Sequence, residues 1–475
     1  MTLDISYIGL EPASRTLDVA PGAANVADVS LGSAADFGGA IVVTGTILDS
    51  AARALNQQRT ADNTTNIVSS DSIGRFPDTN IAEALQRVPG IGVERDQGEG
   101  NFISLRGAPA EFTSITVDGV SLPSTSPDTR AVDLGTIPSD VVNSLEVSKT
   151  LLPYQDADSI AGAVNLVTRS PFDNPRLRVT AWGGASYNEY GDTSDQRLSG
   201  VVSDVFGNVG ALLSASYSQT DRRVDNVESF WNVIERPEGD EILGVPEQEF
   251  KDYDTRRERL ALTGALEFRP SALHRFHLRG TYSRRIDDEY RNLLGLVYEE
   301  GALQPGATEA TATWNRARFI KEFRHRILRD ETLSLSAGGE HELPGARIDY
   351  TGSYTEAEQT YPRRQQLVYR SSLRPNLSYD FSADPDLPAI SIFETGEHLN
   401  LGAYDFRQTT VRSQDTKQTE YALAANVEIP TFLFGNAASY RFGGRIRSRD
   451  VVSDEENYRD RRPESAPDTP LVDLL

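Results

Sequence analysis

The stretch that decides the fold is RLALTGALEF at residues 259–268, in which two kinds of residue alternate. The even positions from Leu260 to Phe268 are apolar or glycine, and the odd positions from Arg259 to Glu267 are arginine, alanine, threonine or glutamate. Successive side chains of a strand point to opposite faces, so this period of two predicts a strand with one apolar face. The same period returns at residues 275–282, 348–354, 421–427 and 440–447. Each segment is roughly ten residues long, the length of a tilted strand that crosses hydrocarbon.

Alternation alone fits either a membrane β-barrel or a soluble β-sandwich, so the connections between the strands decide. Short turns are predicted at Gly207-Asn208, Pro270-Ser271, Pro344-Gly345 and Gly435-Asn436. They alternate with long polar connections, predicted at about 221–253, 292–314 and 361–418. One rim of short turns and another of long loops is typical of outer-membrane barrels. We therefore predict an antiparallel transmembrane β-barrel over residues 171–475, with roughly nine strands. A secreted or surface β-sandwich that binds or degrades glycans is the alternative.

The composition excludes several classes of protein. The 475 residues contain 47 Lys+Arg and 70 Asp+Glu, a formal charge of -23, so nucleic acid is not expected as a partner. The chain has no cysteine, which excludes a disulfide scaffold, a thiol nucleophile and a zinc–thiolate site. A mean hydropathy of -0.42 does not argue against a barrel, because barrel strands alternate apolar and polar residues.

The sequence offers no enzyme motif. His274 and His277 are three apart on a predicted strand and point to opposite faces, so they cannot share a metal ion. The pair Asp156 and Asp158 lacks further acids at the spacing of a calcium loop and is interpreted as part of a solvated loop. We therefore predict no catalytic residue, no metal site and no cofactor.

Residues 60–170 alternate helix and strand signals. Asn80 is a predicted helix N-cap with Glu83 three residues later, and Pro89-Gly90 ends that helix. Short strands follow, and Asp118-Gly119 between two of them is a strong signal for a type I′ hairpin. These elements predict a small mixed α/β domain.

The first 59 residues are of a different kind. Residues 1–31 predict three short strands, at 3–9, 16–19 and 26–31, and residues 32–40 read as a linker of small residues. Ile41-Val42-Val43-Thr44-Gly45 then predicts one isolated strand in a flexible arm that continues to Arg59 with little periodicity. Met1–Ser6 has no secretion signal, and the last residues complete no element, so both ends are expected to be cut.

A series of motifs in the middle of the chain resembles the plug domain of TonB-dependent outer-membrane receptors. They are DSIGRFPDTNIAEALQRVPG at 71–90, ERDQGEG at 94–100, SLRG at 104–107, TVDG at 116–119, IPSD at 137–140, LEVSK at 145–149 and IAGAVNLVTR at 160–169. The subgroup that they resemble most is typical of Caulobacter- and Xanthomonas-like bacteria. Residues 1–31 are similar to the end of the carboxypeptidase-regulatory-like β-domain that often precedes such plugs.

This resemblance implies a domain order and a function. Residues 1–31 would be the remnant of the regulatory-like domain, 32–59 a linker with a TonB-box-like strand, 60–170 the plug domain and 171–475 the N-terminal part of the barrel. The family imports a scarce solute across the outer membrane of Gram-negative bacteria when TonB pulls on an N-terminal strand. Ile41-Val42-Val43-Thr44-Gly45 would be that strand, although it could also be the last strand of the preceding domain. The partners would be the TonB C-terminal domain, outer-membrane lipid and a small solute, which would be a carbohydrate, a siderophore or a similar compound. A family barrel has 22 strands, so the chain is expected to be truncated.

Eight residues of the plug motifs are candidate functional residues. They are Pro89, Gly90, Arg106, Gly107, Asp118, Gly119, Glu146 and Lys149. Arg106 is expected to pair with an acid, in either a breakable contact between plug and barrel wall or an ordinary ion pair. Glu146 and Lys149 have the same two interpretations, whereas Asp118-Gly119 is expected to serve the hairpin turn alone.

Overall fold

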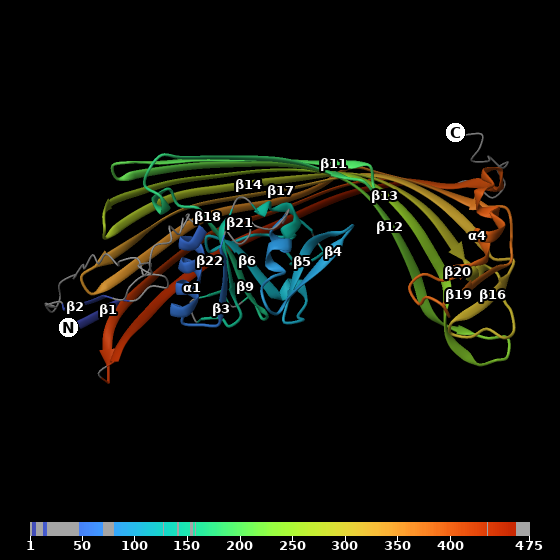
Figure 1. The fold of residues 1–475 in the computed structure, drawn as a ribbon, viewed down its shortest axis with the longest axis horizontal. Helices are drawn as coiled ribbons and strands as arrows, with labels where there is room; N and C mark the ends of the chain where they lie inside the picture. The colour runs from blue at the N-terminus through green and yellow to red at the C-terminus, as the bar shows by residue number, and fades with distance from the viewer. Residues whose placement is uncertain are drawn as a thin grey trace, which may run out of the picture.

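The computed structural model describes residues 2–5, 13–16, 47–69, 80–126, 128–139, 142–152, 155–156, 158–434 and 436–461. The candidate TonB-binding strand Ile41–Gly45 lies outside these residues, as do 71–79 of the first plug motif. The described chain has a small α/β domain, which lies under the concave side of a large antiparallel sheet (Figure 1). We call the face of the large sheet that contacts the small domain its inner face, and the opposite one its outer face.

The N-terminal elements match the sequence prediction only in part. Strand β1 (Thr2–Ile5) pairs antiparallel with β2 (Ala13–Thr16), so the second strand begins earlier than predicted. For residues 47–59, the prediction of a flexible arm is wrong, because Ile47–Thr60 form helix α1. Alanine, leucine, glutamine and arginine dominate this helix, and their high helix propensity outweighs the weak periodicity.

The small domain is built around a five-stranded sheet in the order β3-β8-β9-β6-β7. Its strands are β3 (Thr65–Ser69), β6 (Thr113–Val117), β7 (Val120–Ser121), β8 (Val142–Ser148) and β9 (Gly162–Thr168). Helix α3 (Ile81–Leu85) begins as predicted, because the Glu83 amide donates a hydrogen bond of 3.1 Å to the Asn80 side chain. A separate hairpin consists of β4 (Ile91–Asp96) and β5 (Glu99–Leu105). Single-turn 3-10 helices lie at Ala110–Phe112, Leu134–Thr136 and Pro171–Asp173.

The small domain has its own hydrophobic core. Ile81, Leu85, Leu105, Leu145 and Leu166 are fully buried within it. Among the described residues of this core, Ala261 alone comes from the large sheet. Apart from Ala261, the described part of the large sheet contributes no residue to the hydrophobic core of the small domain.

The large sheet is a single meander of nine antiparallel strands. In order they are β10 (Arg178–Asn188), β11 (Thr193–Phe206), β12 (Val209–Glu235), β13 (Glu241–Ser271), β14 (His274–Val297), β17 (Arg318–Leu343), β18 (Ala346–Ser371), β21 (Tyr404–Leu433) and β22 (Asn436–Arg461). The predicted number of strands is confirmed. A β-sandwich would need two sheets packed face to face, which does not fit this single sheet curved over a domain.

The strands are much longer than predicted. Seven of them, from β12 to β22, have 24 to 31 residues instead of about ten. The long connection predicted at 221–253 is wrong, since β12 and β13 continue through it and only residues 236–240 separate them. A backbone ladder is held by hydrogen bonds between main chains and needs no apolar face, so polar sequence extends the strands here. The short turn at 207–208 is confirmed, as is the one at 344–345.

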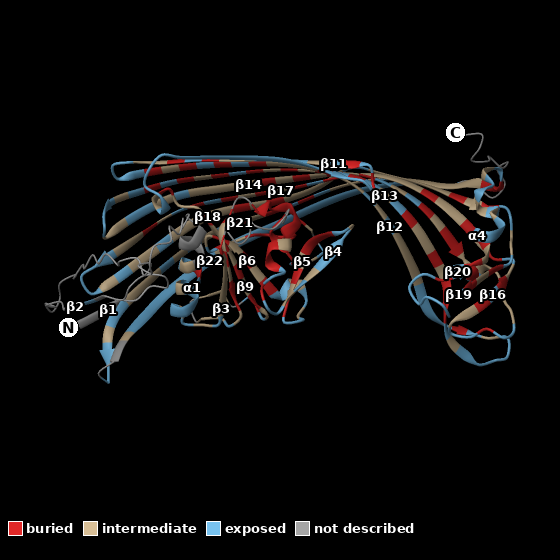
Figure 2. Ribbon diagram, viewed as in Figure 1, coloured by how far each residue is buried: buried red, intermediate tan, exposed pale blue. Residues whose placement is uncertain are grey.

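The predicted alternation decides what each face of the large sheet exposes (Figure 2). On β13 the outer-face residues Leu262 and Leu266 are 40% and 50% exposed. Their neighbours Ala261, Thr263 and Ala265 on the inner face are buried beneath the small domain. Apolar residues on the exposed side and polar residues on the covered side are typical of an outer-membrane wall.

None of the helices in the described part of the chain has both the length and the apolar character needed to span a membrane.

The sequence did not predict a second small unit at the far end of the large sheet, which we call the end subdomain. It contains strands β15 (Ala302–Leu303), β16 (Thr311–Asn315), β19 (Leu377–Asp380) and β20 (Ala389–Ile390), helix α4 (Ser391–Thr395) and 3-10 helices at Tyr298–Glu300, Glu397–Leu399 and Leu401–Ala403. Tyr298, Trp314, Phe319, Tyr379 and Tyr404 form its core. The end subdomain lies at one end of the sheet, whereas the small domain lies beneath the middle part of the sheet (Figure 1).

Candidate functional site

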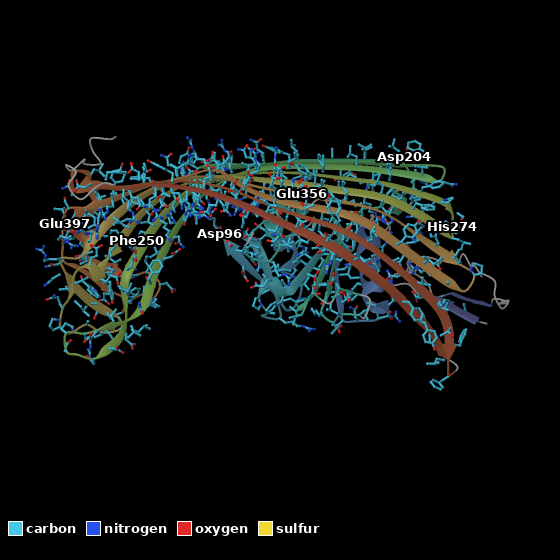
Figure 3. All side chains as sticks on the ribbon, turned by 180° about the vertical axis from the view of Figure 1, so that it is seen from behind. Asp96, Asp204, Phe250, His274, Glu356 and Glu397 are labelled. Atoms are coloured by element: carbon cyan, nitrogen blue, oxygen red, sulfur yellow. The ribbon has the colours of Figure 1, made fainter. Side chains whose placement is uncertain are left out.

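The candidate site is the contact between the β4–β5 hairpin of the small domain and the inner face of the large sheet. Gln97 and Gly98 form the hairpin turn, with φ angles of 51° and 78°. Glycine adopts positive φ at little cost, and this turn brings Gln97 and Glu99 to the large sheet. Asp96, labelled in Figure 3, stands at the free end of this hairpin, which reaches toward the large sheet.

Glu99 is the centre of a buried ionic cluster. Its side chain is 1% exposed, and its carboxylate accepts a hydrogen bond of 2.6 Å from Arg257 Nη1 and another from Arg259 Nη2. Arg222 Nη2 lies 2.7 Å from the other carboxylate oxygen. Burial disfavours the ionised form of Glu99, but the charges of Arg259, Arg257 and Arg222 outweigh burial, so the pKa of Glu99 is lowered. Glu99 is therefore an ionised group held between two domains, and we call these four residues the Glu99 cluster.

The arginines of the Glu99 cluster also bind a second part of the small domain. Arg259 Nε donates a hydrogen bond of 2.8 Å to the carbonyl oxygen of Gly135, which lies in the 3-10 turn after Asp133. On the neighbouring strand, Arg285 pairs with Asp133 at 2.8 Å and with Asp330 of the large sheet at 2.5 Å. Two loops of the small domain are thus attached to the large sheet by guanidinium groups.

A further contact joins the hairpin turn to strand β14. Gln97 Nε2 donates a hydrogen bond to Glu289, whose side chain is fully buried. Glu289 also pairs with Arg324 at 2.6 Å and with Arg326 at 2.5 Å. Glu289 therefore connects the tip of the hairpin to two arginines of the large sheet.

Asp118 has a larger role than the predicted hairpin turn. Its φ of 49° and that of 79° at Gly119 fit the predicted turn. The Asp118 carboxylate also accepts hydrogen bonds from Thr168, of 2.9 Å from the amide and 2.6 Å from the hydroxyl. Arg279 of the large sheet lies 3.6 Å from the same carboxylate. Asp118 thus links two strands of the small domain to the large sheet.

The loop that contains Asp156 and Asp158 provides a third ionic contact. Arg447 on β22 lies 2.9 Å from Asp156 and 2.6 Å from Asp158. A polar cavity of about 590 Å³ lies nearby, lined by Arg130 and Asp128 of the small domain and by Gln418, Arg447 and Arg449 of the large sheet. The interpretation of Asp156 and Asp158 as a merely solvated loop is therefore incomplete.

Most of the other predicted plug residues shape the small domain. Gly90 has a φ of 84° after Pro89, where the chain leaves helix α3. Arg106 and Gly107 form a turn with φ of 57° and 74°, and the exposed Arg106 side chain makes no ion pair with any described residue. The ion pair between the two domains, one of the two interpretations given for Arg106, is formed instead by Glu99 and the arginines of the large sheet that surround it. The sequence contained a signal for this, since Glu99 lies between two glycines at a hairpin turn.

Glu146 and Lys149 do not contact each other as charged partners. Asn165 Nδ2 donates a hydrogen bond of 3.0 Å to the Glu146 carboxylate. The Lys149 backbone amide donates a hydrogen bond of 2.8 Å to the carbonyl oxygen of Thr64. Both residues thus serve the sheet of the small domain.

Within the described ranges, no three histidine or acidic side chains are placed so that they could hold a metal ion.

In the architecture described above, a small domain covers the concave side of an antiparallel sheet (Figure 1) and is held to it by ionic contacts. Residues 57–163 match the family model "TonB-dependent Receptor Plug Domain". The chain thus carries the plug domain of a TonB-dependent receptor, and the small domain is called the plug domain from here on. The proteins that this domain defines are receptors and not enzymes.

Solved structures of such receptors are similar to this chain at low identity. A mutant of the ferric enterobactin receptor PfeA from Pseudomonas aeruginosa is 12% identical, over 82% of this chain and 72% of that one, with a TM-score of 0.39. The unliganded ferric citrate transporter FecA is 11% identical, over 90% and 82%, with a TM-score of 0.33. The siderophore receptor PiuA from Acinetobacter baumannii is 12% identical, over 82% and 62%, with a TM-score of 0.34.

Proposed function

We propose that the protein is an outer-membrane receptor that binds a solute outside the cell and admits it to the periplasm when a TonB partner pulls on residues 41–45. The observation that carries this proposal is the Glu99 cluster. It attaches the plug domain to the large sheet through a carboxylate that is 1% exposed and three guanidinium groups. A contact of this kind is strong while it is dry and becomes weak when water or another anion reaches it.

The remaining plug contacts support the same function. The apolar surface formed by Val117, Leu122 and Leu166 of the plug domain faces Thr281 and Ser334 of the large sheet across a space of about 10 Å³. Thr281 and Ser334 present hydroxyl groups to this apolar surface, so the contact buries less apolar area than a contact between two apolar surfaces would. The plug domain also keeps its own core, so it can shift without unfolding.

The partner site proposed at Ile41-Val42-Val43-Thr44-Gly45 follows from its sequence. A short run of β-formers can add to the edge of a partner's sheet, and main-chain hydrogen bonds would then carry the force. Residues 1–31 are proposed as the remnant of a regulatory-like domain and 32–59 as the linker. The exposed outer-face leucines, such as Leu262 and Leu266, would contact outer-membrane lipid.

Val43→Pro tests the proposal, with Val43→Ala as the matched control. Proline removes one backbone donor and disfavours a paired strand, whereas alanine shortens the side chain and keeps the backbone. Cells that depend on this receptor would be grown on a panel of sole carbon and iron sources. Val43→Pro should abolish growth on the one imported solute while leaving solute binding to whole cells intact, and Val43→Ala should support growth. Equal growth of both variants would refute the role of residues 41–45.

A further inference from the structure

The inner face of the large sheet carries a line of like charges just beyond the tip of the β4–β5 hairpin. Arg364 on β18 stands directly opposite Arg326 on β17 and also directly opposite Arg412 on β21. Side chains directly opposite each other on neighbouring strands have Cβ atoms about 4.5–5.5 Å apart, and like charges in such pairs are destabilising. We call Arg326, Arg364 and Arg412 the arginine row.

The carboxylates near the arginine row do not balance it. Glu289 is shared by Arg326 and the adjacent Arg324, and Glu455 pairs with Arg412 at 2.6 Å. The half-buried Arg364 forms no ion pair with any described residue. Four guanidinium groups therefore face two carboxylates.

Hydrogen bonding is incomplete in the same place. The Nε atoms of Arg324, Arg326 and Arg412 are buried and have no acceptor among the described residues. Buried donors without an acceptor cost free energy, and an acceptor supplied from outside would relieve that cost.

We propose that the arginine row binds a solute with two or more carboxylate groups, and that such acids are the substrate class of this receptor. This inference rests on the proposed uptake function and deepens it. Guanidinium groups bind carboxylates in bidentate geometry, and strands about 4.8 Å apart spread three of them over roughly 10 Å. That span fits the carboxylates of a compact tricarboxylic acid and those of a short uronic acid oligosaccharide.

The position of the arginine row also connects it to the plug domain. A bound carboxylate would compete with Glu289 for Arg326 and Arg324. Glu289 holds the Gln97 side chain at the tip of the hairpin, so weakening its ion pairs weakens that contact. Solute binding and plug attachment would then be coupled through Glu289.

The test is calorimetric titration of the full chain in detergent with tricarballylate, with trigalacturonate and with the uncharged maltotriose. Arg364→Gln should weaken binding of the acids tenfold or more, and Arg364→Lys, which keeps the charge but not the bidentate geometry, should weaken it less than Arg364→Gln does. Arg363→Gln is the matched control, because Arg363 is the neighbouring arginine and is exposed; it should stay within twofold. Preference for tricarballylate or for trigalacturonate identifies which acid fits the row.

Two results would overturn the inference. One is binding of maltotriose as tight as that of either acid, and the other is unchanged acid binding by Arg364→Gln. A purely structural role is tested separately, since removing a like charge should leave the melting temperature of Arg364→Gln unchanged or raised, and a fall of several degrees would contradict the reasoning. If an uncharged solute is imported and its uptake is lost in Val43→Pro, the proposed uptake function stands and this inference fails.

Discussion

Replacing Glu99 by glutamine should detach the β4–β5 hairpin from the large sheet. The change keeps the shape of the side chain and one oxygen that can accept a hydrogen bond, but it leaves the guanidinium of Arg259, which is fully buried, without a charged partner. Arg257 keeps Asp287 at 2.6 Å, so the main loss concerns Arg259. Breaking one side of a buried ion pair costs about 3–5 kcal/mol. At 1.4 kcal/mol for each factor of ten, the hairpin should detach roughly a hundredfold to a few thousandfold more often.

Hydrogen exchange read by mass spectrometry measures this directly. Amides of residues 91–105 should exchange at least a hundredfold faster in Glu99→Gln than in the unchanged protein, while amides of the core strand β9 should change little. The control is Glu94→Gln, which changes an exposed carboxylate of the same hairpin that makes no ion pair with any described residue. If Glu99→Gln and Glu94→Gln exchange alike, the Glu99 cluster does not hold the hairpin.

A second substitution separates lost attraction from stranded charge. Adding Arg259→Met to Glu99→Gln removes the uncompensated guanidinium, so more than half of the lost protection against hydrogen exchange should return.

The stabilisation that Glu99 gives to the hairpin contact should depend on pH in one direction. Because the pKa of Glu99 is lowered, its stabilisation is complete above the ordinary carboxyl pKa of about 4.3 and is lost as the pH falls toward the lowered value.

Two further substitutions test the structure of the plug domain. Asp118→Asn keeps a side chain that tolerates positive φ, but it weakens the hydrogen bonds to Thr168 and the contact with Arg279. Denaturant titration should show a free energy of unfolding lower by about 1–3 kcal/mol. An unchanged free energy of unfolding would show that Asp118 serves the turn alone. Gly100→Ala would place a Cβ atom 2.6 Å from Val93 Cγ1 and should destabilise the plug domain by about 1–3 kcal/mol. The measurement is the melting temperature, and a value equal to that of the unchanged protein would contradict the packing described.

The sequence predicted those features that depend on local chemistry. The alternation from Leu260 to Phe268 determines a strand and its outer face, and the Asn80 side chain determines where a helix begins. The pairing of Glu99 with Arg259 joins residues 160 apart, and it depends on how far along the sheet the plug domain sits. The alternation predicts the face of the sheet on which the Arg259 side chain lies. It does not predict which residues along the strands the hairpin contacts.

The length of the strands was missed for a related reason. Apolar alternation marks the part of a strand that has one apolar face, and it stops where both faces become polar. The backbone ladder of β12 and β13 continues beyond that point with polar residues on both faces, because hydrogen bonding between main chains does not depend on them. The end subdomain was missed because its core gathers Trp314 and Tyr379 from separate connections.

The charges of the inner face explain how one domain can be both held and released, as the proposed uptake requires. An apolar contact loses about 25 cal/mol for each Å² exposed, and no solute can replace it selectively. The ionic contacts here differ, because a carboxylate from outside can take the place of Glu289 on Arg326 without leaving that arginine unpaired. Gln97 would lose its position while the Glu99 cluster stayed intact, so solute binding alone would loosen the hairpin tip but would not free the plug domain. Release would then need a second input, which the pull on residues 41–45 would supply.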